Sequence, residues 1–144
     1  MEITFGAPEH GWVNLSIRDA AYSFEDSISD VPSDFVDQTV VGITNILKSG
    51  SACQVFLSLE PDYYVVMFAK DETLFTFTLE QEIQFVRSSL YQTKGTFSEI
   101  LLPFIEAFQK FYGSHIAEPH WPECDPKNMA KLLEIADKYQ ANLR

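Results

Sequence analysis

Apolar and polar residues alternate near the start of the chain, which predicts β-strands there. Every second residue is apolar over two stretches: Val13, Leu15 and Ile17, then Tyr22 and Phe24. A period of two places the apolar side chains on one face of a strand. Ile3 and Phe5 predict an earlier short strand, and turn residues between positions 8 and 11 separate it from the next one. We therefore expect the chain to begin with strands that each bury one face.

The apolar spacing then changes to three and four residues, which predicts a helix. The residues on this spacing are Val36, Val40, Ile43 and Leu47. Ser33, which follows Pro32, is the expected N-cap, and Asp34 and Asp37 suit the positive N-terminal end of a helix dipole. Lys48 and Gly50 mark its expected end.

Alternation returns between residues 53 and 87 and predicts an antiparallel meander. The alternating apolar residues are Cys53, Val55, Leu57 and Leu59, then Tyr63, Val65 and Met67, then Phe75, Phe77 and Leu79, then Ile83 and Phe85. Turns are expected at Glu60-Pro61-Asp62, at Asp71-Glu72 and near Gln81. In this pattern Ile83 and Phe85 belong to a strand.

Two further helices are predicted in the last third of the chain. Thr96-x-x-Glu99 forms a capping box for the first, Gly113 ends it, and Pro103 predicts a kink or a later start near Leu102. Asp125 and Pro126 cap the second, whose apolar face comprises Met129, Leu132, Leu133, Ala136 and Tyr139. The expected fold is a single α+β domain over residues 1–144, with an antiparallel sheet of five to seven strands packed by two or three helices.

Composition narrows the class of protein. The chain has 144 residues, 46% of them hydrophobic, which is enough for a core without disulfides and excludes a disordered or disulfide-rich protein. No run of roughly 18–20 apolar residues and no signal-peptide pattern is present, so we expect a cytoplasmic protein that does not enter a membrane. Cys53 and Cys124 are expected to be free thiols, and Cys53 to pack in the core.

Charge indicates the kind of partner. The net charge of −11 disfavours nucleic acid and favours a basic protein. Between Arg18 and Lys48 no basic residue occurs, and this stretch holds Asp19, Glu25, Asp26, Asp30, Asp34 and Asp37. A second acidic group comprises Asp62, Asp71 and Glu72, and Tyr22, Tyr63, Tyr64 and Tyr91 stand beside acids or in turns, as in many protein-binding patches. The alternative is an ordinary solvated surface, with Asp34 and Asp37 explained by the helix N-terminus alone.

Catalytic and metal-binding motifs give little support for an enzyme. No phosphate-binding glycine motif and no diagnostic nucleophile spacing occur, and we expect no cofactor. Glu80 and Glu82 share a strand face but lack other features of a glycosidase site. His115, His120 and Cys124 could ligate zinc, although their spacing matches neither a zinc finger nor the H-E-x-x-H helix of a metalloprotease. The alternative is a structural connection in which Trp121 enters the core.

Several short motifs resemble those of a type of small bacterial protein. These are Phe5-Gly6-Ala7-Pro8-Glu9-His10-Gly11-Trp12, Val31-Pro32-Ser33-Asp34, the turn from Glu60 to Tyr64, and His120-Trp121-Pro122. Such proteins are similar to the immunity partners of polymorphic and contact-dependent growth-inhibition toxins, the CdiI type. The resemblance implies a non-enzymatic, acidic, cytoplasmic inhibitor that binds the toxin domain of its own system, often a nuclease. The motifs are structural, so no toxin-contact residue is carried over from them.

Charge and resemblance together define the expected site. The candidate toxin-binding residues are Glu25, Asp26, Asp30, Asp34 and Asp37, with Asp62, Asp71 and Glu72 as a second patch. Two alternatives remain open: a small metal-binding protein or enzyme that uses His115, His120 and Cys124, and an acidic adaptor subunit of a larger assembly.

Overall fold

In the residues that the structure describes, the fold is one seven-stranded antiparallel sheet with three helices. The computed structural model describes residues 1–31, 34–113 and 125–143. Strand order in the sheet follows chain order, from β1 to β7. The elements are β1 (Glu2–Phe5), β2 (Trp12–Asp19), β3 (Tyr22–Ser29), α1 (Phe35–Ser49), β4 (Cys53–Ser58), β5 (Tyr63–Asp71), β6 (Leu74–Ile83), β7 (Val86–Gly95), α2 (Phe97–Gly113) and α3 (Pro126–Asn142). This confirms the predicted α+β class, and the numbers of strands and helices are at the upper ends of the predicted ranges, five to seven strands and two or three helices.

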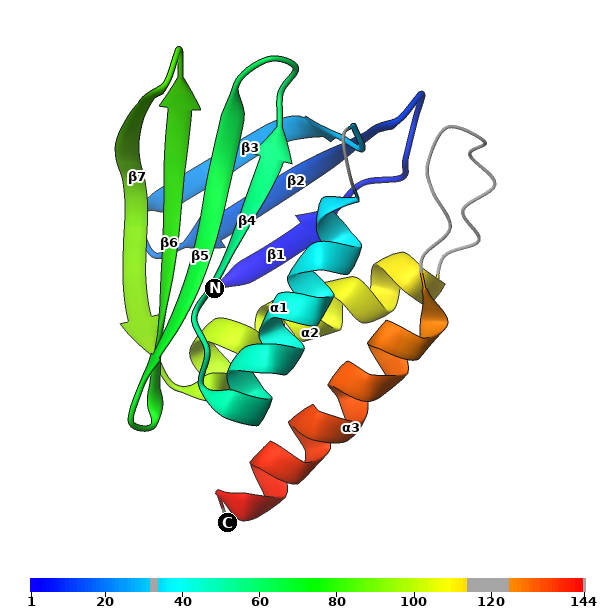
Figure 1. Ribbon diagram of the computed structural model, residues 1–144, viewed down its shortest axis with the longest axis vertical. Helices are drawn as coiled ribbons and strands as arrows, with labels where there is room; N and C mark the ends of the chain where they lie inside the picture. The colour runs from blue at the N-terminus through cyan, green and yellow to red at the C-terminus, as the bar shows by residue number, and fades with distance from the viewer. Residues whose placement is uncertain (32–33, 114–124, 144) are drawn as a thin grey trace.

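The sheet bends sharply between β3 and β4. These two strands pair at a single position, Ser29 opposite Ser58. The ring of Tyr22 on β3 stacks on Tyr91 of β7, with centroids 4.3 Å apart. In a flat sheet, strands four places apart would be separated by about 19 Å. The stacking therefore requires that β1–β3 turn back across the inner face of β5–β7, and Figure 1 shows the two groups of strands crossing at a steep angle.

Tyrosine–aspartate hydrogen bonds join the two parts of the bent sheet. The Tyr64 hydroxyl donates to Asp26 Oδ2 at 2.7 Å, and the Tyr91 hydroxyl donates to Asp19 Oδ2 at 2.5 Å. Phe24 meets Tyr64 edge to face, with ring centroids 4.8 Å apart. Burial, followed by the hydrogen bond and the charge of Asp26, raises the pKa of Tyr64 to about 12. Tyr64 and Tyr91 therefore have a structural role, because their hydroxyls join the two parts of the sheet.

The helices cover the concave side of the sheet and complete an aromatic core. Phe104 on α2 packs against Phe68 and Phe77 of the sheet, with ring centroids 5.0 and 5.3 Å apart. Phe5 on β1 stacks on Phe108 of α2 at 5.6 Å. In Figure 1, α1 and α3 run side by side in front of α2. None of the helices in the described ranges is long and apolar enough to cross a membrane.

The helix boundaries follow the capping residues closely. The N-cap of α1 is Asp34, so the prediction of Ser33 for that position is wrong, and Gly50 ends this helix at φ +74° as expected. Glu99 Oε2 accepts the backbone N–H of Thr96 at 2.8 Å, which confirms the glutamate half of the predicted capping box of α2. The Thr96 hydroxyl donates to the same oxygen at 3.1 Å. This helix begins at Phe97 and continues through Pro103, so the later start near Leu102 is wrong.

The β6–β7 hairpin differs from the prediction. The turn expected near Gln81 is wrong, because β6 continues to Ile83 and the turn consists of Gln84 and Phe85. Phe85 is therefore not a strand residue. Gln-Phe has none of the residue types that favour a tight turn, and β7 carries few apolar side chains to reveal its alternation. The turn at residues 60–62 lies where the sequence placed it, and the turn expected at Asp71-Glu72 lies one residue later, at Glu72 and Thr73.

Candidate protein-binding surface

The first predicted acidic group does not form one exposed patch. Glu25 is exposed on β3, whereas Asp26 points to the inner face and accepts the Tyr64 hydroxyl. Asp30 lies at the end of β3, half-buried, with its backbone N–H donated to the Gly11 carbonyl at 2.9 Å. Asp34 and Asp37 lie at the start of α1. The carboxylates of residues 26, 34 and 37 make hydrogen bonds within the protein.

Asp34 acts as the cap of α1. Its Oδ1 accepts the backbone N–H groups of Val36 at 2.9 Å and Asp37 at 3.4 Å. Its Oδ2 is buried and makes no hydrogen bond within the described part of the chain. Burial, reinforced by the charges of Asp37 and Asp30, raises the pKa of Asp34 to about 6, although the cap bonds oppose the shift.

Asp37 ties the three helices together. Its Oδ1 accepts the Tyr112 hydroxyl of α2 at 3.2 Å. The side-chain amide of Asn128 on α3 donates to Oδ1 at 3.2 Å and to Oδ2 at 3.1 Å. This carboxylate therefore supports the packing of α1 against both other helices.

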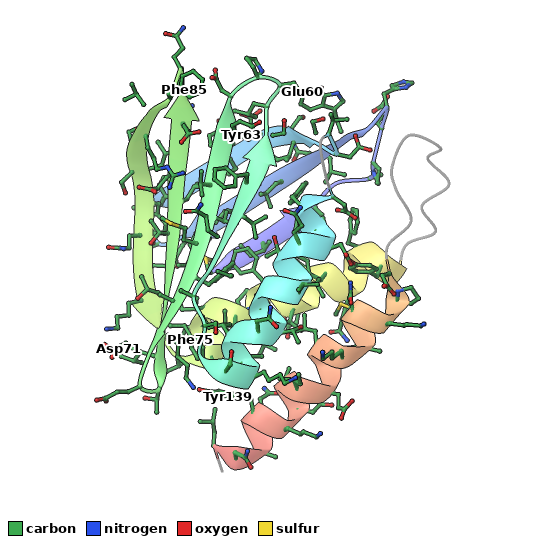
Figure 2. The ribbon with its side chains drawn as sticks, viewed as in Figure 1. Glu60, Tyr63, Asp71, Phe75, Phe85 and Tyr139 are labelled. Atoms are coloured by element: carbon green, nitrogen blue, oxygen red, sulfur yellow. The ribbon has the colours of Figure 1, made fainter. Side chains whose placement is uncertain are left out.

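The second predicted acidic group is divided between two ends of the molecule. Asp62 precedes β5, and Asp71 ends it nine residues later, which corresponds to about 30 Å along the strand. Asp71 pairs with Lys94 Nζ at 3.2 Å, and Glu72 follows it in the turn. Figure 2 shows Tyr63 and Asp71 at opposite ends of the sheet. The structure thus brings Asp71 and Glu72 together and places Asp62 elsewhere.

The end of the sheet that holds Asp62 carries the most exposed apolar side chains. Phe85 is 98% exposed, Val86 70% and Ile83 44%. Gln84 and Phe85 both have positive φ, +49° and +68°, as a type I′ hairpin turn requires. Phenylalanine is rare in this backbone region because its Cβ crowds the neighbouring carbonyl. A large apolar ring is thus held in water on a strained backbone.

A surface cleft of about 240 Å³ lies between this turn and the β4–β5 turn. Its lining consists of Pro61, Asp62, Tyr63, Glu82, Gln84 and Phe85. The backbone N–H of Gln84 donates to Asp62 Oδ1 at 3.1 Å and joins the two turns. Tyr63 and Glu82 face each other across β5 and β6. Figure 2 shows Tyr63, Glu60 and Phe85 at this same end of the sheet. We call this site the tip cleft.

An arginine lies on the outer face of the sheet close to the tip cleft. The guanidinium of Arg87 lies over the Phe56 ring, 5.7 Å from its centroid. The same group is 3.3 Å from Glu82 Oε1 and 3.7 Å from Glu80 Oε1. This surface therefore already binds one guanidinium between an aromatic ring and carboxylates.

Acidic groups predominate around the tip cleft. Glu60 and Asp62 form no ion pair within the described ranges, while Glu80 and Glu82 share Arg87. At the opposite end of β5, Asp71 and Glu72 stand beside two lysines, Lys70 and Lys94. The negative charge is thus locally in excess at the tip cleft and nearly balanced at the other end.

The predicted metal ligands cannot be placed. His115, His120 and Cys124 lie outside the described residues, as do Trp121 and the His120-Trp121-Pro122 motif. In the described ranges, no group of three or more His, Cys, Asp or Glu residues could hold a metal ion. Cys53 is a free thiol that packs against the core, and burial raises its pKa to about 11.

Sequence reasoning missed Phe85 as a surface residue. Its spacing from Ile83 matched a buried strand, and no glycine, asparagine or proline marked the turn. Of the four tyrosines singled out beside acids, Tyr22, Tyr64 and Tyr91 join the two parts of the sheet, and only Tyr63 lines the tip cleft. No signal in the sequence separates these two roles.

Comparisons with models of protein families, with curated proteins and with solved structures found no match for this chain. Among the described residues, some of those that carry the resemblance to immunity proteins lie in turns between strands. Gly11, with φ +81°, turns the chain between β1 and β2, and residues 60–62 form the β4–β5 turn.

Proposed function

We propose that this chain is a toxin-neutralising immunity protein that binds a basic toxin domain and occludes it. The observation that carries the proposal is the tip of the sheet, where a fully exposed aromatic ring is surrounded by excess acidic charge. Aromatic residues are enriched at protein interfaces, where they act as anchors inside a polar rim. The net charge of −11 favours capture of a positively charged partner over the whole surface.

The proposed mechanism separates steering from anchoring. Acids spread over the molecule, including Glu25 and Asp30, produce the negative field that accelerates encounter with a basic domain. The tip then provides apolar contact area that holds the complex together. Occlusion follows if the basic residues that bind the protein are those with which a nuclease domain binds its nucleic acid.

The proposal is tested by capture followed by rescue of growth. The tagged chain is incubated with lysate of its source organism, and bound proteins are eluted with a salt gradient and identified by mass spectrometry. Each captured basic domain is then expressed alone and together with this chain. We expect one domain that arrests growth alone and is harmless when both are expressed. A captured partner that is not toxic would indicate an adaptor, and a toxin that this chain does not neutralise would contradict the proposal.

A further inference from the structure

We propose that the tip cleft binds an arginine side chain of the basic partner, with Phe85 and Tyr63 as aromatic surfaces and Asp62 and Glu82 as carboxylate acceptors. This inference rests on the proposed function and specifies the place and chemistry of contact. Four observations support it.

The first observation is the composition of the cleft. Two aromatic side chains and two carboxylates line a single volume of about 240 Å³. A guanidinium is planar, stacks on aromatic faces and donates two parallel hydrogen bonds to a carboxylate. An ammonium group matches the carboxylates but gains less from the rings. The lining therefore fits arginine better than lysine.

The second observation is that the neighbouring surface binds arginine in this way. Arg87 lies over Phe56 and reaches Glu82 at 3.3 Å. Tyr63 meets Phe56 edge to face, with centroids 5.7 Å apart, so the aromatic surface continues from the internal arginine into the cleft. Glu82 borders both places, and Arg87 contacts its Oε1, which leaves Oε2 facing no basic group in the described part of the chain.

The third observation is the strained position of Phe85. Its φ of +68° and its 98% exposure mean that the fold gains no packing from the ring. Asparagine or glycine would suit this turn better. Strained residues of this kind cluster at binding sites, where the strain holds a side chain in place for a ligand.

The fourth observation is charge complementarity. Glu60 adds a further carboxylate beside the cleft, and the bond from Gln84 to Asp62 fixes the two turns relative to each other. The cleft is thus formed before binding, which lowers the entropic cost of binding. A loop of a basic domain that presents arginine is the occupant that these groups fit.

The test uses a short peptide as the probe and NMR to locate it. The peptide acetyl-Gly-Arg-Gly-Arg-Gly-amide is titrated into the ¹⁵N-labelled chain at low salt, and a peptide with citrulline in place of arginine serves as the neutral control. We expect the largest amide shifts at Asp62, Tyr63, Glu82, Gln84 and Phe85. Citrulline should weaken binding strongly, because it retains the shape of arginine but lacks its charge.

Matched variants separate the contribution of the tip cleft to peptide binding from that of the overall negative charge of the protein. Phe85→Asn removes the ring at a position where asparagine suits the backbone, and should weaken peptide binding about three- to fivefold. Asp62→Asn with Glu82→Gln should weaken it about threefold or more. Asp71→Asn with Glu72→Gln removes the same number of charges about 30 Å away and should change peptide binding less than twofold.

The proposal is overturned if the arginine peptide does not bind, if its shifts centre on the 71–72 turn, or if the two charge-removing pairs weaken binding equally. Failure of the cleft is distinct from failure of the proposed function. If Phe85→Asn binds the peptide and rescues growth as the wild type does, the cleft is not the contact site, although the immunity function stands. If the peptide binds at the cleft but the chain neutralises no toxin, the immunity function fails and the arginine site remains.

Discussion

At the scale of single residues, Phe85 destabilises the folded protein. A non-glycine residue in the left-handed region is destabilised by about 1–2 kcal/mol, and Phe85 has no buried contacts to offset this. We predict that Phe85→Asn folds at least as stably as the wild type, with a gain of up to about 1 kcal/mol, measured by urea denaturation.

The same substitution at a buried phenylalanine of the adjoining strand, β6, provides the control for that measurement. Phe75→Asn on β6 removes a fully buried ring and should destabilise the protein by about 3 kcal/mol or more. A loss of stability in Phe85→Asn would show that the ring contributes to the fold. The stabilising outcome would agree with a residue retained for binding.

Asp34 gives a prediction for the dependence of stability on pH. Its folded pKa of about 6 lies above the ordinary 3.8, so between these values the folded state binds a proton that the unfolded state has lost. The contribution of this group to the free energy of unfolding is therefore largest below pH 3.8 and falls as pH rises towards 6. Asp34→Asn keeps a cap acceptor and cannot ionise.

We predict that Asp34→Asn is more stable than the wild type at about pH 7.5, and that the difference shrinks at about pH 5.5. Urea denaturation at the two pH values measures it. Asp34→Ala, which also cannot ionise but loses the cap bonds, should be less stable than Asp34→Asn by about 1 kcal/mol. A difference between Asp34→Asn and the wild type that does not vary with pH would mean that Asp34 is ionised normally.

At the scale of elements, Asp37 connects α1 with α2 and α3. Replacing it with alanine leaves the Tyr112 hydroxyl and the Asn128 amide without this acceptor. We predict a loss of about 2–3 kcal/mol for Asp37→Ala, because the hydrogen bonds involve a charged group. Asp37→Asn, which keeps one acceptor oxygen, should lose less. Thermal denaturation compares the two, and equal losses would contradict the assigned role.

The ends of the helices could be predicted from sequence, whereas strand β7 and the partners of Asp37 could not. The helices could be predicted almost to the residue, because Thr96, Gly113, Asp125 and Pro126 satisfy or end the helical backbone through local chemistry. Strand β7 could not be predicted in this way, because its pairing depends on β6 and few of its side chains are buried. Asp37 was recognised as an acid at a helix start, yet its partners lie 75 and 91 residues away. Such long-range contacts leave no local signal.

At the scale of the whole molecule, the net charge and the tip should affect different rate constants. Long-range attraction acts before contact and sets the association rate, whereas an anchor in the interface sets the dissociation rate. With the captured partner, we predict that Glu25→Lys slows association and Phe85→Asn speeds dissociation. Surface plasmon resonance at two salt concentrations measures both. Salt should reduce the association rate by about tenfold or more and affect dissociation less. If Glu25→Lys mainly speeds dissociation, this residue belongs to the interface.

The single pair between β3 and β4 has a consequence for how the protein avoids aggregation. A sheet usually has two free edges, but here most of β3 and much of β4 also lack a neighbouring strand along the bend. Open edges can add a strand from another chain, and charged side chains discourage this. Glu25 and Asp26 lie on the open part of β3, and Asp26 Oδ1 accepts the backbone N–H of Ser27 at 2.8 Å. We therefore expect the acids near the bend to discourage one copy of the protein from extending the sheet of the next.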